Sequence, residues 1–134
     1  MIAVSITNSH VPVRVLLVED HPDLAAVTAE FLAAKGLNVR TALSGRDALD
    51  TASVFQPELV LCDLNLPDMS GLNVADELRS NPLTRRAYVV IVSASAGLEA
   101  DAARFGVDAF AVKPLTSEVV RTLVNAAASA RQQS

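Results

Sequence analysis

The stretch LVLCDLNLPDMSG, residues 59 to 71, joins an apolar run to a single carboxylate and then to residues typical of loops. Its first four residues, Leu59 to Cys62, form a continuous apolar run, which is typical of a strand buried on both faces of a parallel sheet. Asp63 follows directly, and Asn65 and Gly71 are residue types that favour turns. The stretch therefore predicts a buried central strand that delivers a charge to the edge of a sheet.

The rest of the chain repeats this pattern, in which a short apolar run is followed by a segment with helical periodicity. Such alternation predicts an α/β fold, a doubly wound sheet of five parallel strands with five helices on its two faces. The predicted strands span residues 13–18, 38–42, 59–62, 88–92 and 109–112.

The sequence predicts the apolar face of the first helix and the position of the fourth. The first carries Leu24, Val27, Phe31 and Leu32 on one apolar stripe, which we expect to pack against the sheet. A short fourth helix is predicted over residues 98–105 from the spacing of its apolar positions.

Length and composition limit the possible classes of protein. The 134 residues are enough for one domain, which we expect to span residues 13–130, with flexible termini at 1–12 and 131–134. A net charge of −4 and a pI of about 5.0 argue against a direct nucleic-acid surface. The sequence contains neither a signal peptide nor an apolar run long enough to span a membrane, so we expect a cytoplasmic domain.

Polar residues follow four of the five predicted strands directly. They are Glu19 and Asp20, then Asp63, then Ser93, and finally Lys113, which precedes Pro114. In an open parallel sheet, ligands bind beyond the carboxyl ends of the strands. These side chains are therefore the candidate site.

The residue types at these strand ends indicate a divalent cation and a phosphoryl group. Two carboxylates ~4 Å apart repel by about 4 kcal/mol near a protein surface, so a cluster of them favours a bound cation. Oxygen ligands suit a hard ion such as Mg²⁺, which also binds phosphate. Ser93 and Lys113 can contact phosphoryl oxygens, and Asp63 is a candidate nucleophile that would form an aspartyl phosphate.

Four segments carry a resemblance to a known family, and they cover most of the chain. They are LLVED at 16–20, LVLCDLNLPDMSG at 59–71, VIVSA at 90–94 and GVDAFAVKP at 106–114. From about Arg14 to Ala130 the chain resembles the receiver domain of two-component response regulators, of which the chemotaxis regulator is a member. The resemblance implies a flavodoxin-like sheet with strand order 2-1-3-4-5.

The resemblance also implies a role for each residue of the metal and phosphorylation site. Asp63 would accept the phosphoryl group. Asp20 and Asp63 would bind Mg²⁺ directly, together with the main-chain carbonyl of Asn65, and Glu19 would act through a metal-bound water. Lys113 would pair first with Asp63 and then with the phosphoryl oxygens.

Three further residues would form the switch and its backbone support. Ser93 matches the hydroxyl that turns towards the phosphoryl group, and Phe110 matches the aromatic residue that moves inward with it. The Lys113–Pro114 peptide bond is expected to be cis, which is inexpensive before proline.

The function implied by the resemblance is a phosphorelay step rather than enzymatic turnover. A histidine kinase or a histidine phosphotransfer protein would donate the phosphoryl group, and the domain would catalyse only its own phosphorylation and dephosphorylation. A downstream protein would read the face formed by the fourth helix, the fifth strand and the fifth helix. We expect a stand-alone receiver, while a receiver excised from a hybrid kinase or a longer regulator remains open.

Two other functions are compatible with parts of the pattern. A phosphatase of the haloacid dehalogenase type also uses an aspartate after a strand, but it needs a second aspartate two residues later, where this chain has Asn65. A receiver-like binding module without phosphorylation would need neither the acidic residues nor Lys113. Both alternatives are weaker interpretations of the same strand ends.

Overall fold

The computed structural model describes residues 11–95 and 103–132. Within these ranges a five-stranded sheet has the order β2-β1-β3-β4-β5, and every pair of neighbouring strands is parallel. The strands are β1 (Arg14–Val18), β2 (Asn38–Ala42), β3 (Leu59–Asp63), β4 (Tyr88–Ser93) and β5 (Ala109–Val112). The flavodoxin-like order predicted from the sequence is confirmed.

The central strand β3 is the one that the apolar run at Leu59 predicted. It pairs with β1 on one side and with β4 on the other, and its first four residues are buried. Asp63 is its last residue and is only partly buried, so the charge lies where the strand leaves the core.

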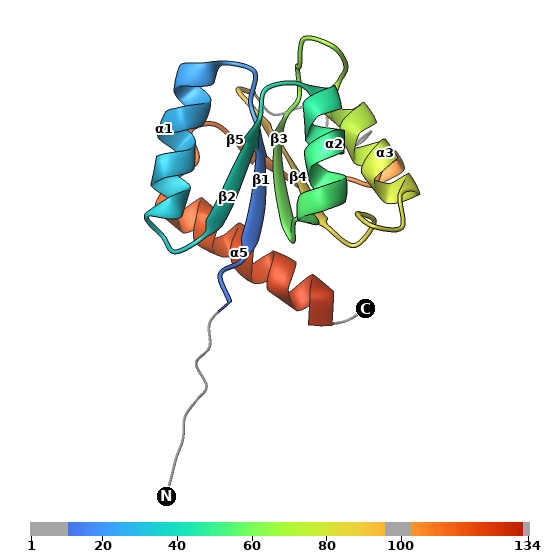
Figure 1. The fold of residues 1–134 in the computed structure, drawn as a ribbon. Helices are drawn as coiled ribbons and strands as arrows, with labels where there is room; N and C mark the ends of the chain where they lie inside the picture. The colour runs from blue at the N-terminus through green and yellow to red at the C-terminus, as the bar shows by residue number, and fades with distance from the viewer. Residues whose placement is uncertain (1–10, 96–102, 133–134) are drawn as a thin grey trace, which may run out of the picture.

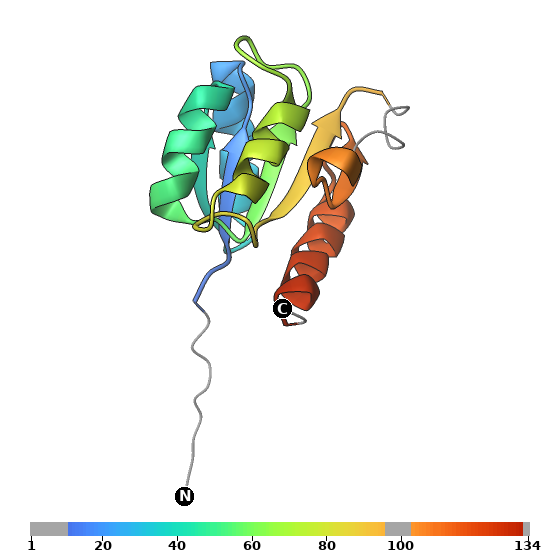
Figure 2. The same cartoon turned by 90° about the vertical axis from the view of Figure 1, so that its right-hand side faces the viewer.

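Helices cover both faces of the sheet (Figure 1). The described α-helices are α1 (Pro22–Ala33), α2 (Gly45–Phe55), α3 (Gly71–Ser80) and α5 (Ser117–Gln132). Helices α2 and α3 contact each other on one face (Figure 2), while α1 and α5 cover the other. Successive residues of a strand point to opposite faces, so Leu16 packs under α2 and α3, whereas Leu17 packs under α1 and α5.

The predicted count of five helices is not reproduced in the part of the chain that the structure describes. Four α-helices lie there, together with a 3₁₀ helix over Ala103–Phe105. The predicted fourth helix began at Leu98, and its first five residues, 98–102, lie outside the described ranges. The remaining three residues have the tighter 3₁₀ geometry, and Gly106, whose φ is +84°, follows them.

The predicted stripe on the first helix is correct only in part. Leu32 is fully buried and Phe31 is partly buried, but Leu24 and Val27 are 42% and 66% exposed. Helical periodicity identifies a stripe of apolar residues, but it does not show how much of that stripe the neighbouring elements cover.

None of the described helices has the length and apolar character of a membrane span.

Candidate functional site

The predicted site residues lie at the carboxyl edge of the sheet: Asp63 and Ser93 are the last residues of β3 and β4, and Glu19 and Lys113 follow β1 and β5 directly. Val18 pairs with Cys62 across β1 and β3, so Glu19 and Asp63 leave neighbouring strands at the same level. Val112 pairs with Ser93 across β4 and β5, and the amide of Lys113 donates to the Ser93 carbonyl at 2.8 Å. The ladder register thus brings Lys113 to the same edge as the carboxylates.

The ammonium group of Lys113 bridges two carboxylates from different strands. Its Nζ lies 3.0 Å from Glu19 Oε1 and 3.5 Å from Asp63 Oδ2. The side chains of Glu19 and Asp63 are only 6% and 13% exposed, so water compensates little of their charge. Burial lowers the pKa of Lys113, but its hydrogen bond to Glu19 and the nearby charge of Asp63 outweigh burial and raise that pKa. The lysine therefore remains cationic at neutral pH.

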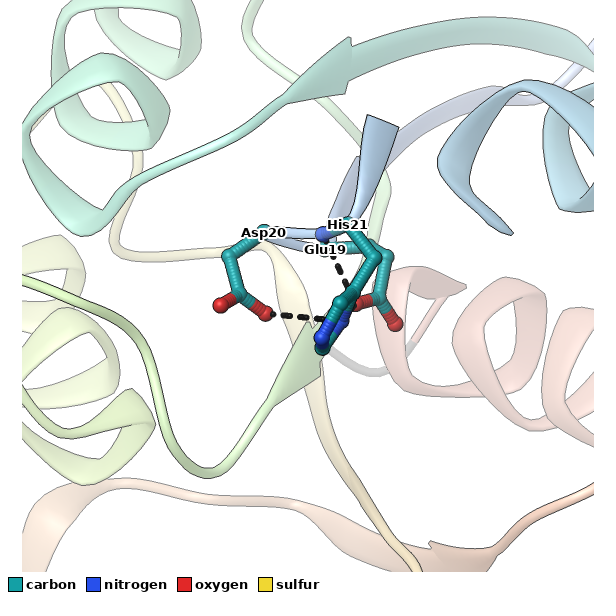
Figure 3. Close-up of side chains that lie close together, drawn as sticks. All are labelled: Glu19, Asp20 and His21. Atoms are coloured by element: carbon teal, nitrogen blue, oxygen red, sulfur yellow. Dashed lines mark hydrogen bonds and ion pairs between the residues drawn. The ribbon is translucent and has the colours of Figure 1, made fainter. Parts of the chain in front are cut away.

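Glu19, Asp20 and His21 form a compact cluster after β1 (Figure 3). His21 Nδ1 lies 2.9 Å from Glu19 Oε2 and 3.3 Å from Asp20 Oδ1. The hydrogen bond to Glu19 and the charge of Asp20 raise the pKa of His21. Burial raises the pKa of Glu19, but hydrogen bonds from His21 and Lys113 outweigh it, so that pKa is lowered. The cluster thus places two carboxylates and an imidazole beside Lys113.

The donor atoms of this edge fit a hard divalent cation. Among the described residues, Asp20 Oδ1 is buried and accepts no hydrogen bond, although His21 Nδ1 is 3.3 Å away. A buried carboxylate oxygen without such a partner is costly unless a ligand satisfies it. The carboxylates and nearby main-chain carbonyls supply the oxygen ligands that Mg²⁺ prefers. The residues that are present therefore fit the ion that the sequence predicted.

The loop after β3 folds tightly against Asp63. The amide of Gly71 donates to the Leu64 carbonyl at 2.7 Å, and Asn65 forms an isolated antiparallel bridge with Ser70. A Cβ atom on Gly71 would lie 2.4 Å from the main-chain oxygen of Asp63, so the approach requires glycine. This closed loop carries Asn65 beside the strand end.

The two predicted switch residues belong to β4 and β5. Ser93 is 8% exposed, and its hydroxyl accepts a hydrogen bond from the Ser95 amide at 3.3 Å. Phe110 is partly buried and packs against the core under α2 and α3. The Lys113–Pro114 bond is cis, as the resemblance implied. The serine and the lysine are adjacent across the ladder, while Phe110 lies deeper on one face.

A groove of about 330 Å³ extends from this edge along α1. Glu19, Asp63 and Lys113 line it together with apolar side chains of α1, and these include the exposed Leu24 and Val27. The apolar surface that the sequence assigned to the core is therefore open and adjoins the charged site.

Two polar contacts near the site were not predicted from the sequence. The ring of His21 contacts both of its acidic neighbours, Glu19 and Asp20. The carboxylate of Asp68 accepts hydrogen bonds from the first two amides of α2. The position of His21 directly after two acidic residues was a usable signal, whereas the sequence offers none for the partner of Asp68, 23 residues away.

The fold and the site together define a class of protein. It is the class of doubly wound α/β domains with an acidic cluster and a lysine at the carboxyl ends of a parallel sheet. Within that class, this chain belongs to the response regulator receiver domain family, whose model matches residues 15–125.

Individual relatives agree with this assignment. The chain is 40% identical over 114 residues to the "Probable transcriptional regulatory protein TcrX" of Mycobacterium tuberculosis, an alignment that covers 81% of this chain and 47% of that protein. It is 34% identical over 116 residues to the cell cycle response regulator CtrA of Brucella ovis, covering 84% and 49%. The chain thus spans about half the length of the curated relatives it matches.

A solved structure gives the same result for the fold. The response regulator protein TrrA of Thermotoga maritima, determined in complex with Mg²⁺ and BeF, superposes with a TM-score of 0.76 at 27% identity. The match covers 86% of this chain and 98% of that one.

Proposed function

We propose that this chain is a phospho-accepting receiver domain, in which a phosphoryl group moves from a phosphohistidine to Asp63 in the presence of Mg²⁺. The observation that carries the proposal is the position of Lys113. Its ammonium lies 3.5 Å from Asp63 and 3.0 Å from Glu19, beside an acidic cluster at the carboxyl edge of the sheet. A carboxylate with an adjacent fixed cation is suited to phosphoryl transfer.

In the proposed reaction a carboxylate oxygen of Asp63 attacks the phosphorus atom in line with the leaving group. The new bond joins this oxygen to phosphorus, and the bond from phosphorus to the donor's imidazole nitrogen breaks. That nitrogen leaves with the electron pair and takes up a proton from solvent. Lys113, already beside Asp63, would donate a hydrogen bond to a phosphoryl oxygen and offset its charge.

The acidic residues would hold the cation. Asp20 and Asp63 would bind it through carboxylate oxygens, Asn65 through its main-chain carbonyl, and Glu19 through a water molecule. When bound, Mg²⁺ would neutralise negative charge on the phosphoryl group. The buried Asp20 Oδ1, which accepts no hydrogen bond from the described residues, supports its part in this set.

The output would be a change in packing at the edge formed by β5 and α5. Phosphorylation adds about two negative charges and three acceptor oxygens at the end of β3. Ser93 is the last residue of the neighbouring strand β4 and could turn its hydroxyl towards them, and Phe110 would then move further into the core. A downstream protein would bind the altered face.

The groove along α1 suits a protein as the phosphodonor. Leu24 and Val27 expose apolar surface that leads directly to Asp63 and Lys113. A histidine kinase or a histidine phosphotransfer protein would cover this surface while presenting its phosphohistidine to Asp63. The continuity of the groove with the charged site supports such a partner.

The test compares the wild type with Asp63→Asn in Mg²⁺ and acetyl phosphate, with the added mass of a phosphoryl group as the readout. We expect saturable modification of the wild type and none of Asp63→Asn. Lys113→Ala should retain Mg²⁺ binding and lose the response. Turnover of acetyl phosphate with no accumulation of phosphorylated protein would instead indicate a phosphatase, and a wild type that is neither modified nor active would indicate a binding module; either result would overturn the proposal.

A further inference from the structure

The N-terminus of α2 is capped from two different parts of the chain. Ser44 Oγ accepts a hydrogen bond from the Asp47 amide at 3.1 Å, which is a local cap. Asp68 accepts two more, with Oδ1 2.8 Å from the Gly45 amide and Oδ2 2.8 Å from the Arg46 amide. These three amides have no partner within the helix, so the two side chains together satisfy the open end of α2.

Asp68 belongs to the loop that carries Asn65, and that loop approaches α2 closely. A Cβ atom on Gly45 would lie 2.4 Å from Met69 Cγ, so the helix terminus and the loop are in contact. The two backbone hydrogen bonds also lower the pKa of Asp68, which keeps its carboxylate ionised. The contact is therefore a charged cap made across 23 residues of sequence.

The loop after β3 is also closed by its own hydrogen bonds, so a contact that holds one of its residues restricts the others as well. The Gly71 amide donates to the Leu64 carbonyl, and Asn65 bridges to Ser70 at the base of the loop. Asp68 lies between these closing contacts. Holding its carboxylate against α2 fixes the orientation of the loop, and with it the orientation of the Asn65 main chain.

We propose that Asp68 is a positioning residue, which ties the metal-binding loop to α2 and thereby sets the Asn65 carbonyl for Mg²⁺. This inference rests on the proposed function, because it needs the Mg²⁺ site. It also has a reciprocal consequence: if the Asp68 contact favours Mg²⁺ binding, Mg²⁺ binding must stabilise the contact by the same factor. The α2 terminus and the metal site are then energetically linked.

The first measurement is the Mg²⁺ dissociation constant of unphosphorylated protein by calorimetry. Asp68→Asn keeps the shape of the side chain but replaces one acceptor oxygen with a donor, and we expect about tenfold weaker binding, as for other partners that orient metal ligands. Ser44→Ala is the matched control, because it removes the other cap from the same helix end without touching the loop. We expect its Mg²⁺ affinity to equal that of the wild type.

A second measurement needs no variant and applies even where Asp68→Asn fails to fold. The amides of Gly45 and Arg46 should exchange with solvent more slowly when Mg²⁺ is added to the wild type, by a larger factor than the Asp47 amide that Ser44 caps. Equal protection of all three amides, or none, would overturn the inference. So would a loss of Mg²⁺ affinity in Ser44→Ala as large as that in Asp68→Asn, since the effect would then arise from helix stability alone.

Mg²⁺ binding by the wild type and by Asp68→Asn distinguishes a wrong positioning role from a wrong proposed function. If the wild type binds Mg²⁺ and Asp68→Asn binds it equally well, the positioning role is wrong and the proposed function stands. If the wild type binds no Mg²⁺, the metal site of the proposed function is wrong and the positioning role falls with it.

Discussion

The two faces of the sheet are covered to different degrees. Under α2 and α3, the inward side chains of Ala48, Val74 and Leu78 are at most 1% exposed. Along α1 on the opposite face, Leu24 and Val27 remain 42% and 66% exposed and line a groove that reaches the charged edge. Both faces have a buried core, but the α1 side also retains an apolar groove beside the site.

This difference separates stability from recognition. Burying apolar surface stabilises a fold by roughly 25 cal/mol per Å², so the buried side chains under α2 and α3 contribute most of what they can. Contiguous apolar surface that remains open on a folded domain is typical of an interaction site. We therefore expect that the same substitution changes the free energy of unfolding more in the core under α2 and α3 than along the groove at α1.

The largest expected effect is on the free energy of unfolding. Leu78→Ala removes a fully buried side chain of α3 and should cost about 3 kcal/mol, because it leaves a cavity. The same change at Leu24, which is 42% exposed, should cost about 1 kcal/mol or less. Urea unfolding of both variants measures the difference. Equal losses would mean that α1 packs as tightly in solution as α3 does.

A second effect concerns the close approach between α3 and the end of β3 at Asp63. A Cβ atom on Gly71 would lie 2.4 Å from the Asp63 main-chain oxygen and 3.2 Å from Ile91 Cδ1, so Gly71→Ala should cost about 2 kcal/mol. It should also slow modification by acetyl phosphate, since Asp63 must shift. Gly36→Ala is the control. The φ of Gly36 is +86°, which strains any other residue by about 1 kcal/mol, but no atom lies within 4 Å of the position of an added Cβ.

In the Gly71 experiment, urea unfolding gives the cost and mass spectrometry gives the rate of modification. Gly36→Ala should be less stable than the wild type and be modified at the same rate. If Gly71→Ala is modified at the wild-type rate, the close approach does not position Asp63.

A third effect should appear only with a protein donor. Val27→Asp places a charge in the groove, and we expect phosphoryl transfer from a phosphorylated histidine kinase that acts on the wild type to slow about tenfold, equivalent to 1.4 kcal/mol. Modification by acetyl phosphate, which needs no protein contact, should be unchanged. Val54→Asp is the matched control, because Val54 is 80% exposed on α2, on the opposite face. Equal slowing in both variants would remove the groove from the donor interface.

The strand ends could be predicted from the sequence because their determinants are local. A continuous apolar run identifies a buried parallel strand, and the residue after it must lie at the carboxyl edge. Glu19, Asp63 and Lys113 were found in this way, and the ladder register brings the lysine within 3.5 Å of both carboxylates. The roles assigned to these residues stay predictions, since their chemistry depends on ligands and partners.

The exposure of α1 and the Asp68 contact depend on tertiary structure and could not be predicted in the same way. The periodicity of Leu24 and Val27 is that of a buried stripe, yet the elements packed beside α1 leave that part of the helix open. Asp68 meets α2 because the loop after β3 folds back across 23 residues, and a Pro-Asp pair suggests only a turn. The exposed part of α1 and the Asp68 contact both lie near the site, and in both cases the local sequence pattern predicts something other than the observed tertiary packing.

The smallest expected effect is a pH dependence of stability that comes from the contact between Asp68 and the N-terminus of α2. This contact lies on the α2 side of the sheet, so the effect tests how firmly the loop after β3 is held on that side. The pKa of folded Asp68 is lowered by the Arg46 and Gly45 amides, while the unfolded value is about 3.9. The contact therefore stabilises the fold above the unfolded pKa, and this stabilisation is lost as pH falls through the folded pKa. The melting temperature of Asp68→Asn should lie below that of the wild type from pH 7 to about pH 5, and the difference should close in stronger acid.

Ser44→Ala is the control, because it removes a cap that has no titrating group. The difference between its melting temperature and that of the wild type should stay constant over the same pH range. A difference for Asp68→Asn that persists unchanged to about pH 2 would mean that the carboxylate charge does not hold the loop against α2.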